Sequence, residues 1–232
     1  GVATYGALMK STWAAVEAIR TFDLPPGAPV MIDIRNPIHH TAMFFALALL
    51  GLPSASVGTA FVAEKAGYLP QLFLTDRADA QGAGIRTIQV DDRWFTVDPV
   101  TRPNYSGLLA LPSFPGPDSI VRFVYSSGTT GHPKCVGLTE ACFNLRFQHL
   151  MAARSWWMEG ATIVNMMGFS TIAGTMQMLR FHSSGALLAY AGEPAEVGQM
   201  LRLFRANGLI ASTGHLQALL KTLGDSKPPP SL

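Results

Sequence analysis

The order of apolar and polar residues in the first half of the chain alternates between helical and strand spacing. Between Tyr5 and Ile19 apolar residues recur every three or four positions, which predicts an amphipathic helix over residues 4–21 with Thr4 as its N-cap. Residues 38–50 predict a second helix, buried on most of its sides. Three short runs predict interior strands: Val30–Ile34, Ala55–Val57 and Leu72–Thr75. Alternation of this kind indicates a parallel sheet covered by helices.

The second half of the chain repeats this alternation. Apolar and β-forming runs predict strands over residues 120–125, 134–138, 161–166, 186–190 and 209–211. Helical periodicity is found over residues 172–182, 195–207 and 214–223. The fold class that follows is α/β, with helix-covered and mostly parallel sheets in two subdomains.

Two segments between these halves break the pattern. Thr87–Val90 and Trp94–Val97 are separated by three charged residues, which predicts a hairpin at a sheet edge. The 22 residues that follow contain five prolines, too many for either regular element. We therefore expect a linker over residues 98–118, which ends a first subdomain, 1–118, before a second subdomain, 119–232.

Composition limits the classes of function that the chain can have. Its 232 residues are 48% hydrophobic and 14% charged, which is typical of a globular chain. The net charge of +2 is too small to attract nucleic acid or anionic lipid, so we expect no nucleic-acid partner. Cys135 and Cys142 lie seven positions apart with no Cys-x-x-Cys pair. This spacing argues against a disulfide framework and a zinc site, and it favours a cytoplasmic location.

One uncharged stretch has the length of a membrane span. Residues 41–63 contain no Asp, Glu, Lys or Arg, but Gly51 and Pro53 interrupt them. We therefore expect a helix, a stop and a short strand, and no membrane span. His39 and His40 begin this helix, and adjacent histidines point in different directions on a helix. We expect them to be a solvent-facing or capping pair, and no metal site.

The stretch Ser126–Lys134, SSGTTGHPK, joins two runs of strand-forming residues. A Walker phosphate loop has glycine directly before its lysine and a helix directly after it. Here Pro133 precedes Lys134 and β-forming residues follow, with Thr139 as the expected cap of the next helix. A phosphate-loop hydrolase would instead require a helix that begins at Lys134.

The residue types of this stretch suit an anion. Gly128 and Gly131 let backbone N–H groups turn toward one point, the hydroxyl residues add donors, and Lys134 adds a positive charge. A hydrogen bond to a charged group contributes roughly 1.5–3 kcal/mol, so three or four of them could hold a polyphosphate. The same residues also form ordinary Ser/Thr/Gly turns, so composition alone leaves both interpretations open.

The ordered string Phe123–Lys134 resembles the signature of the adenylate-forming superfamily, which includes acyl-CoA synthetases, adenylation domains of peptide synthetases and luciferases. That signature runs aromatic, Ser/Thr, Ser-Gly, Ser/Thr, Thr-Gly, any residue, Pro-Lys. Further similarities follow in the family's order: Thr4-Tyr5 with Leu8, Pro26-Gly27 before residues 30–34, Phe45–Pro53, and Glu159-Gly160 before a strand. The resemblance spans essentially the whole chain and implies the N-terminal portion of the large domain of an AMP-forming acyl-CoA synthetase.

The resemblance implies a two-step reaction. A carboxylate attacks the α-phosphate of Mg-ATP and releases pyrophosphate, and a thiol, of coenzyme A or of a carrier protein, then attacks the acyl-adenylate. The loop would grip the β- and γ-phosphates, with Lys134 and Thr130 as catalytic residues. The implied cofactors are therefore ATP, Mg²⁺ and coenzyme A. The implied nucleotide-binding residues are Ser126, Ser127, Gly128, Thr129, Thr130, Gly131 and Lys134.

Some positions depart from the family's pattern. Cys135 stands where glycine is usual, and Glu140 stands where histidine is usual. The family's Phe-His-x-x-Gly segment, which helps to shape the acyl pocket, is blurred into residues 166–174, where Phe169, Ser170 and Gly174 are the best matches and serine stands in place of histidine. We expect these three residues to bind the acid. We expect Cys135 to be a small packing residue, because no histidine stands at a defined spacing from it.

Several family segments have no counterpart in these residues: the Tyr-Gly-x-Thr-Glu segment, the Asp that holds the ribose, the hinge, and the catalytic lysine of the C-terminal domain. We therefore expect the first half of an adenylating enzyme, with little or no turnover by residues 1–232 alone. An acyl-CoA synthetase, as in fatty acid metabolism, is the first interpretation. A peptide-synthetase-type adenylation domain and a degenerate, non-catalytic nucleotide- or acyl-binding module remain open.

Overall fold

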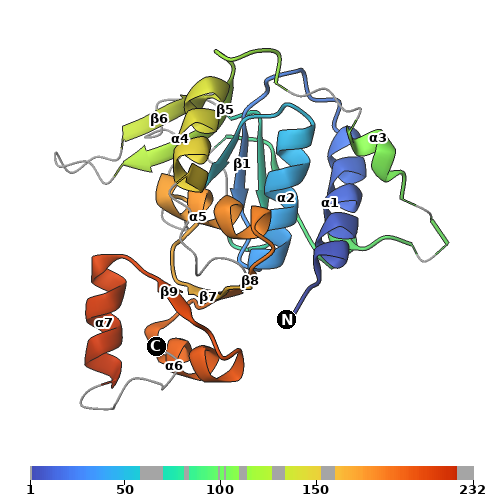
Figure 1. The fold of residues 1–232 in the computed structure, drawn as a ribbon. Helices are drawn as coiled ribbons and strands as arrows, with labels where there is room; N and C mark the ends of the chain where they lie inside the picture. The colour runs from blue at the N-terminus through green and yellow to red at the C-terminus, as the bar shows by residue number, and fades with distance from the viewer. Residues whose placement is uncertain are drawn as a thin grey trace. The chain divides into compact units, whose positions relative to one another are not determined.

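The computed structural model describes residues 2–57, 70–80, 84–98, 100–101, 103–109, 114–126, 134–152 and 160–223. Contacts divide the chain into two compact units, Gly1–Phe143 and Asn144–Leu232 (Figure 1). The elements of the first unit are α1 (Tyr5–Arg20), β1 (Val30–Asp33), α2 (Pro37–Leu49), β2 (Ser54–Ser56), β3 (Leu72–Thr75), β4 (Thr87–Gln89), the 3₁₀ helix η2 (Asp92–Phe95), α3 (Tyr105–Leu109), β5 (Ile120–Ser126) and β6 (Lys134–Thr139). The next helix, α4 (Glu140–Ala152), crosses the division. The elements of the second unit are β7 (Thr162–Asn165), α5 (Ile172–Ser183), β8 (Leu187–Tyr190), α6 (Pro194–Leu203), β9 (Gly208–Ile210) and α7 (Thr213–Leu223).

The first unit is built on a six-stranded sheet in the order β4-β3-β1-β2-β5-β6, in which β6 alone is antiparallel to its neighbour. Val30 of β1 lies in register with Ser54 of β2 on one side and Leu72 of β3 on the other. Every residue of β1 and β3 is buried, as is typical of interior strands of a parallel sheet. The predicted parallel sheet is therefore present.

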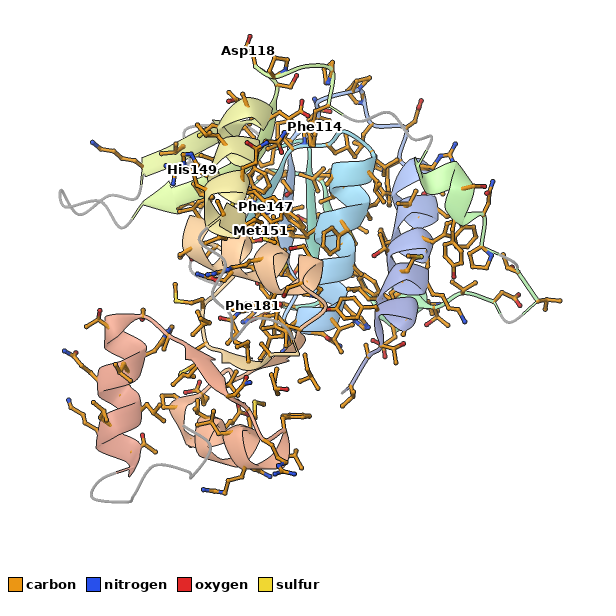
Figure 2. All side chains as sticks on the ribbon, in the orientation of Figure 1. Phe114, Asp118, Phe147, His149, Met151 and Phe181 are labelled. Carbon is orange, nitrogen blue, oxygen red and sulfur yellow. The ribbon has the colours of Figure 1, made fainter. Side chains whose placement is uncertain are left out.

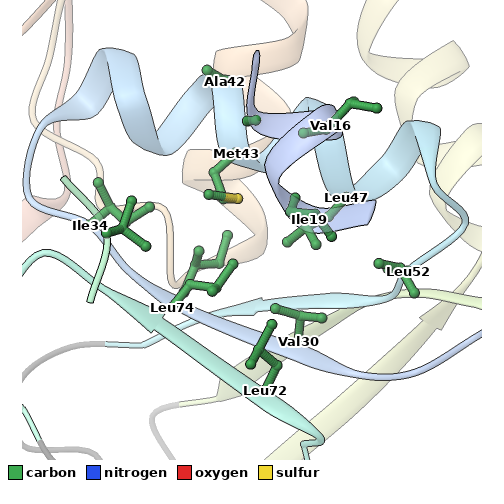
Figure 3. Close-up of a cluster of buried hydrophobic side chains, with 14 of the residues drawn as sticks. Val16, Ile19, Val30, Ile34, Ala42, Met43, Leu47, Leu52, Leu72 and Leu74 are labelled. Carbon is green, nitrogen blue, oxygen red and sulfur yellow. The ribbon is translucent and has the colours of Figure 1, made fainter. Parts of the chain in front are cut away.

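The main core of this unit lies between the sheet and the two long helices (Figure 3). Val16 and Ile19 of α1 and Met43 and Leu47 of α2 are almost fully buried. They meet Val30, Leu72 and Leu74 from the strands. Burial of each such side chain contributes roughly 1.5–3 kcal/mol, so this cluster dominates the stability of the unit.

Side-chain caps set where the two long helices begin. The Thr4 hydroxyl accepts a hydrogen bond from Ala7 N at 3.1 Å, which confirms the predicted N-cap of α1. The Asn36 carboxamide oxygen accepts from Ile38 N at 3.0 Å, with Pro37 at the first helical position of α2. Gly51 follows α2 with φ +66°, a conformation that favours glycine and ends the helix.

The hairpin expected over residues 87–97 is wrong. Thr87–Gln89 forms β4, which pairs in parallel with β3 at the edge of the sheet. The Asp91 carboxylate accepts from Arg93 N at 3.0 Å and caps the 3₁₀ helix η2, so the chain coils where a second strand was expected. Phe95 is buried at the end of this turn. In the described part of the segment predicted as a linker, 98–118, residues Tyr105–Leu109 form the short helix α3.

The boundary between the two compact units lies later in the chain than the subdomain boundary expected from the sequence. The proline-rich segment suggested a boundary at residues 118 and 119, whereas the first unit continues to Phe143. The reason is that β5 pairs in parallel with β2, with Ser54 opposite Arg122, and carries β6 with it into the first sheet. A change in composition along the chain could not show which sheet β5 joins.

The second unit contains a three-stranded parallel sheet in the order β8-β7-β9. Ile163 of β7 packs with Phe181 of α5 on one face, and Figure 2 labels Phe181. Val164 packs with Val197 of α6 and Leu219 of α7 on the other face. The predicted alternation of strand and helix is confirmed here, with helix bounds that differ by a few residues.

The uncharged stretch does not form a long helix. α2 ends at Leu49, well short of the length that crosses a bilayer. Among the residues that the structure describes, no helix combines the length and hydrophobicity of a membrane span.

Candidate functional site

The glycine-rich stretch joins the two antiparallel strands of the first sheet. Ser126 is the last residue of β5 and Lys134 is the first residue of β6, and the two lie opposite each other in the register. The Lys134 side chain is exposed. Residues 127–133 lie outside the described part of the chain. The predictions for Ser127, Gly128, Thr129, Thr130 and Gly131 therefore remain predictions.

The structure excludes a Walker phosphate loop here. Lys134–Thr139 is a strand, and the following helix begins only at Glu140. Cys142 N donates to the Thr139 hydroxyl at 3.3 Å, which agrees with the expected cap. A phosphate-loop hydrolase would need a helix from Lys134 onward.

A buried arginine connects β5 to β2 below the start of the loop. Arg122 is 1% exposed, and its two terminal nitrogens donate to the Ser54 hydroxyl at 2.8 Å and the Ser56 hydroxyl at 2.5 Å. Its guanidinium lies 5.2 Å from the ring centroid of Phe44 of α2. Strand β5, which leads into the glycine-rich stretch, is thereby attached to the interior of the sheet by side chains as well as by backbone hydrogen bonds.

His40 continues this network and contradicts the expected solvent-facing or capping pair. Its side chain is 4% exposed, and burial, followed by the charge of Arg122, lowers its pKa to about 3. The imidazole is therefore neutral at pH 7. Nδ1 lies 3.1 Å from the carbonyl oxygen of Ile34 and must donate, so Nε2 accepts from the Ser56 hydroxyl at 2.7 Å. One directed chain thus runs from Arg122 through Ser56 and His40 to Ile34.

Charged side chains gather at the carboxyl ends of β1 and β3. Burial raises the pKa of Asp33, and Arg77, at 3.9 Å, opposes that rise. Arg35 pairs with Asp76 at 3.2 Å across the same edge. Within the described ranges no group of three or more His, Cys, Asp or Glu side chains could hold a metal ion.

Cys135 lies beside the loop but lacks the surroundings of a reactive thiol. It is half-buried in β6, opposite Tyr125 of β5. Burial raises its pKa, and a hydrogen bond with Tyr125 opposes this rise only in part. This agrees with the expectation of a packing residue.

The three residues expected to bind the acid lie around the amino end of α5. The ring of Phe169 lies 5.3 Å from the ring of Tyr190, at the end of β8. Ser170 lies half-buried in the turn between β7 and α5. A Cβ at Gly174 would lie 2.0 Å from the carbonyl oxygen of Gly168, so only glycine lets the helix approach this turn.

Two threonines hold this turn in place. The Thr171 hydroxyl accepts from Gly174 N at 3.0 Å and caps α5. The Thr175 hydroxyl donates to the carbonyl oxygen of Phe169 at 3.2 Å. The three predicted residues are therefore brought together at the carboxyl edge of a parallel sheet, where α/β proteins commonly bind ligands.

Comparison with known proteins decides the family. The family model for AMP-binding enzymes matches residues 2–228. The chain belongs to the AMP-binding enzyme family. Both the adenylate-forming family and the α/β fold class predicted from the sequence are thereby confirmed.

Solved structures share the fold of this AMP-binding chain at low sequence identity. o-Succinylbenzoate CoA synthetase from Bacillus subtilis, in complex with its acyl-adenylate, has a TM-score of 0.78 at 17% identity, over 100% of this chain and 61% of that one. The N-terminal domain of FACL13 from Mycobacterium tuberculosis has a TM-score of 0.75 at 15% identity, over 99% and 61% of the two chains. VinN in complex with L-aspartate has a TM-score of 0.75 at 16% identity, over 100% and 62%.

The AMP-binding chain is shorter than these neighbours. It spans 48% of the first and 61% of the second structure of the B. subtilis synthetase. No curated protein matches it in sequence.

Proposed function

We propose that the protein containing this chain is an AMP-forming ligase that joins a carboxylic acid to a thiol, with coenzyme A as the acceptor. The observation that supports this most strongly is the string Phe123–Lys134, which bridges β5 and the antiparallel β6 in a chain of the AMP-binding family. A carboxylate oxygen of the acid attacks the α-phosphorus of ATP, and the bond to the β-phosphate breaks. The thiol sulfur then attacks the acyl carbon of the adenylate, AMP leaves, and the thiol proton passes to solvent.

The glycine-rich stretch would act on the leaving pyrophosphate. Negative charge grows on the β- and γ-phosphates as the α-phosphate is attacked, and donors already in place stabilise this charge without reorganisation. We assign this role to the backbone and hydroxyl groups of residues 126–131 and to the ammonium group of Lys134, with Thr130 and Lys134 as the catalytic pair. The network of Arg122 and His40 would keep β5, and so the start of the loop, in register.

The neighbouring structures support this choice of ligands. The B. subtilis synthetase has been solved with ATP and magnesium ion, with its acyl-adenylate, and with a coenzyme A analogue of its product. Mg²⁺ at such sites is held by substrate phosphates and one or two carboxylates, and it would neutralise phosphate charge. The carboxylate that the family resemblance implies for this metal is among the segments that have no counterpart in residues 1–232. We propose that the metal's protein ligand lies elsewhere in the protein and that the reaction takes place in the cytoplasm.

Acid-dependent exchange of labelled pyrophosphate into ATP tests the proposal. The protein containing this chain should catalyse exchange with at least one member of a panel of fatty, aryl and amino acids. Exchange with amino acids alone would favour a peptide-synthetase-type adenylation domain.

Lys134→Ala tests the role of the loop in the same assay. Loss of a charge-assisted hydrogen bond should lower kcat/KM for ATP roughly 10- to 100-fold. Lys221→Ala, which removes an exposed lysine from α7, is the matched control and should leave exchange unchanged. Wild-type exchange by Lys134→Ala at limiting ATP would refute the assigned role.

A second candidate is a non-catalytic module that binds nucleotide or acyl-adenylate. It is favoured by Cys135, Glu140 and Ser170, which stand where the family usually has glycine, histidine and histidine. Calorimetry with ATP and with acyl-adenylate analogues distinguishes the two functions. Binding without exchange for any acid would favour the module.

A further inference from the structure

A buried amide lies at the carboxyl edge of the second sheet. Asn165 is the last residue of β7, the central strand, and is 2% exposed. Its Cα lies in register with Tyr190 of β8 and Ile210 of β9. Its backbone carbonyl oxygen accepts from Ala191 N at 3.0 Å. Asn165 is thus fixed at the point where the strands of a parallel sheet end and where ligands commonly bind.

The orientation of its carboxamide follows from one hydrogen bond. The backbone N–H of Met167 lies 2.9 Å from the side-chain oxygen of Asn165. Because a backbone N–H can only donate, the oxygen must face Met167 and the nitrogen must face another direction. That nitrogen is buried, and no acceptor within the described part of the chain reaches it.

A buried donor without an acceptor is uncommon in folded proteins. Such a group loses its hydrogen bonds to water on folding and gains nothing in return, so native structures pair it with protein, with ordered water or with a ligand. The two residues that precede Asn165 in β7, Ile163 and Val164, are apolar and pack against helices. The amide nitrogen of Asn165 is therefore a candidate ligand contact.

Its surroundings connect it to the expected acyl site. Side chains alternate along a strand, so Asn165 shares a face with Ile163, which packs with Phe181 of α5. Tyr190 lies beside Asn165 in the register, and its ring lies 5.3 Å from the ring of Phe169. The strand position of Asn165 is therefore next to that of Tyr190, whose ring belongs to the aromatic pair that would border the acyl group.

We propose that Asn165 donates a hydrogen bond to an oxygen of the acyl group, so that the preferred acids carry an oxo, hydroxyl or second carboxyl group. This inference rests on the proposed ligase function, because it takes Phe169 as part of the acyl site. A plain alkyl acid would cover the amide nitrogen of Asn165 without offering it a hydrogen-bond acceptor. Sites built for a hydrogen bond discriminate strongly against ligands that cannot make it. We expect the oxygenated acid to be preferred about 10-fold or more.

Matched acids that differ by one oxygen test the preference. The values of kcat/KM for pyrophosphate exchange are compared for hexanoate and 5-oxohexanoate, and for 3-phenylpropanoate and 3-(4-hydroxyphenyl)propanoate, with the protein containing this chain. Asn165→Leu removes the donor, and Asn165→Asp removes it while keeping the acceptor for Met167. Asn207→Ala is the control, because Asn207 is exposed and its amide oxygen accepts from Thr162 N at the opposite end of β7.

The proposal expects a preference of about 10-fold or more for an oxygenated acid in the wild type and in Asn207→Ala, reduced to about twofold in Asn165→Leu and Asn165→Asp. An equal rate for both acids of every pair, or a preference unchanged in the Asn165 variants, would overturn it.

A direct measurement separates this inference from the ligase proposal. The side-chain amide resonance of Asn165, identified by its loss in Asn165→Leu, should shift when an oxygenated acid is added and not when its alkyl partner is added. A shift without any exchange would support the binding site and reject the ligase. Exchange with no shift for any acid that reacts would reject the site and keep the ligase.

Discussion

At the scale of single residues, one hydrogen-bonded chain explains the protonation state of a buried histidine. His40 must donate to Ile34 and accept from Ser56, and Ser56 in turn accepts from Arg122. A proton on Nε2 would remove the acceptor and would place a second positive charge beside the guanidinium. The folded protein therefore keeps the imidazole neutral to a pH far below its usual range.

This network makes stability depend on pH. The pKa of His40 is lowered from 6.5 to about 3 on folding, so between these values the unfolded chain binds a proton that the folded chain does not. Above pH 6.5 the neutral His40 does not reduce the free energy of unfolding. As the pH falls below 6.5 the free energy of unfolding decreases, by about 2 kcal/mol at pH 5. Urea unfolding at pH 7.5 and pH 5 should show a smaller loss for His40→Gln than for the wild type.

The comparison between variants isolates His40 from other groups. Asp33, whose pKa is raised on folding, acts with the opposite sign, and His182, whose pKa is lowered, acts with the same sign. Both groups are present in every variant, so they cancel in the difference. His149→Gln, which removes an exposed histidine, should keep the wild-type dependence on pH. An identical loss for His40→Gln and the wild type would contradict the account.

At the scale of elements, apolar periodicity was sufficient to predict strands and helices where each element buries one face against a parallel sheet. The strand and helix bounds of the second unit could be predicted because its sheet is parallel and each helix buries one face. The hairpin at residues 87–97 could not, because the Asp91 carboxylate satisfies a backbone N–H and stabilises a turn that the apolar pattern does not reveal.

The turn before α5 depends on Gly174, which lies one position later than the spacing of the family's Phe-His-x-x-Gly segment gives. Alanine at position 174 would place its Cβ 2.0 Å from the carbonyl oxygen of Gly168, so the turn that carries Phe169 and Ser170 must move. We expect Gly174→Ala to lower the free energy of unfolding by about 1–3 kcal/mol. We also expect a higher KM for the acid in the exchange assay, because the turn borders the expected acyl site.

Gly6→Ala is the matched control for this substitution. Its Cβ would lie 3.8 Å from the Thr4 hydroxyl, an ordinary contact in an exposed turn of α1. Alanine favours a helix over glycine by up to about 1 kcal/mol, so Gly6→Ala should be neutral or stabilising. Equal free energies of unfolding for both variants in urea would show that the turn at Gly168 can move away from a Cβ at position 174 at little cost.

At the scale of the whole molecule, the sequence identified the family but not the roles of two buried residues. The ordered string up to Lys134 identified the family, because a strand–loop–strand of that composition is specific. The roles of His40 and Asn165 could not be predicted, because they depend on partners far away in the sequence: Arg122 for His40, Tyr190 and Ile210 for Asn165. Only the folded sheets bring those residues together.

The length of the neighbours leads to a prediction about turnover. This chain spans 61% of the B. subtilis synthetase, and the family segments that hold the ribose and carry the catalytic lysine have no match in it. Residues 1–232 alone should therefore show no acid-dependent exchange of pyrophosphate under conditions in which the protein containing them is active. Full exchange by these residues alone would show that the loop and the acyl site are sufficient.

The central claim is that a carboxylate oxygen attacks the α-phosphorus of ATP, and an isotope measures this most directly. The protein containing this chain is incubated with ATP, coenzyme A and an acid that supports exchange, with both carboxylate oxygens labelled with ¹⁸O. The account predicts that each AMP released carries one ¹⁸O on its phosphate, seen as an isotope shift in the ³¹P spectrum. Unlabelled AMP, or ADP as the product, would contradict it.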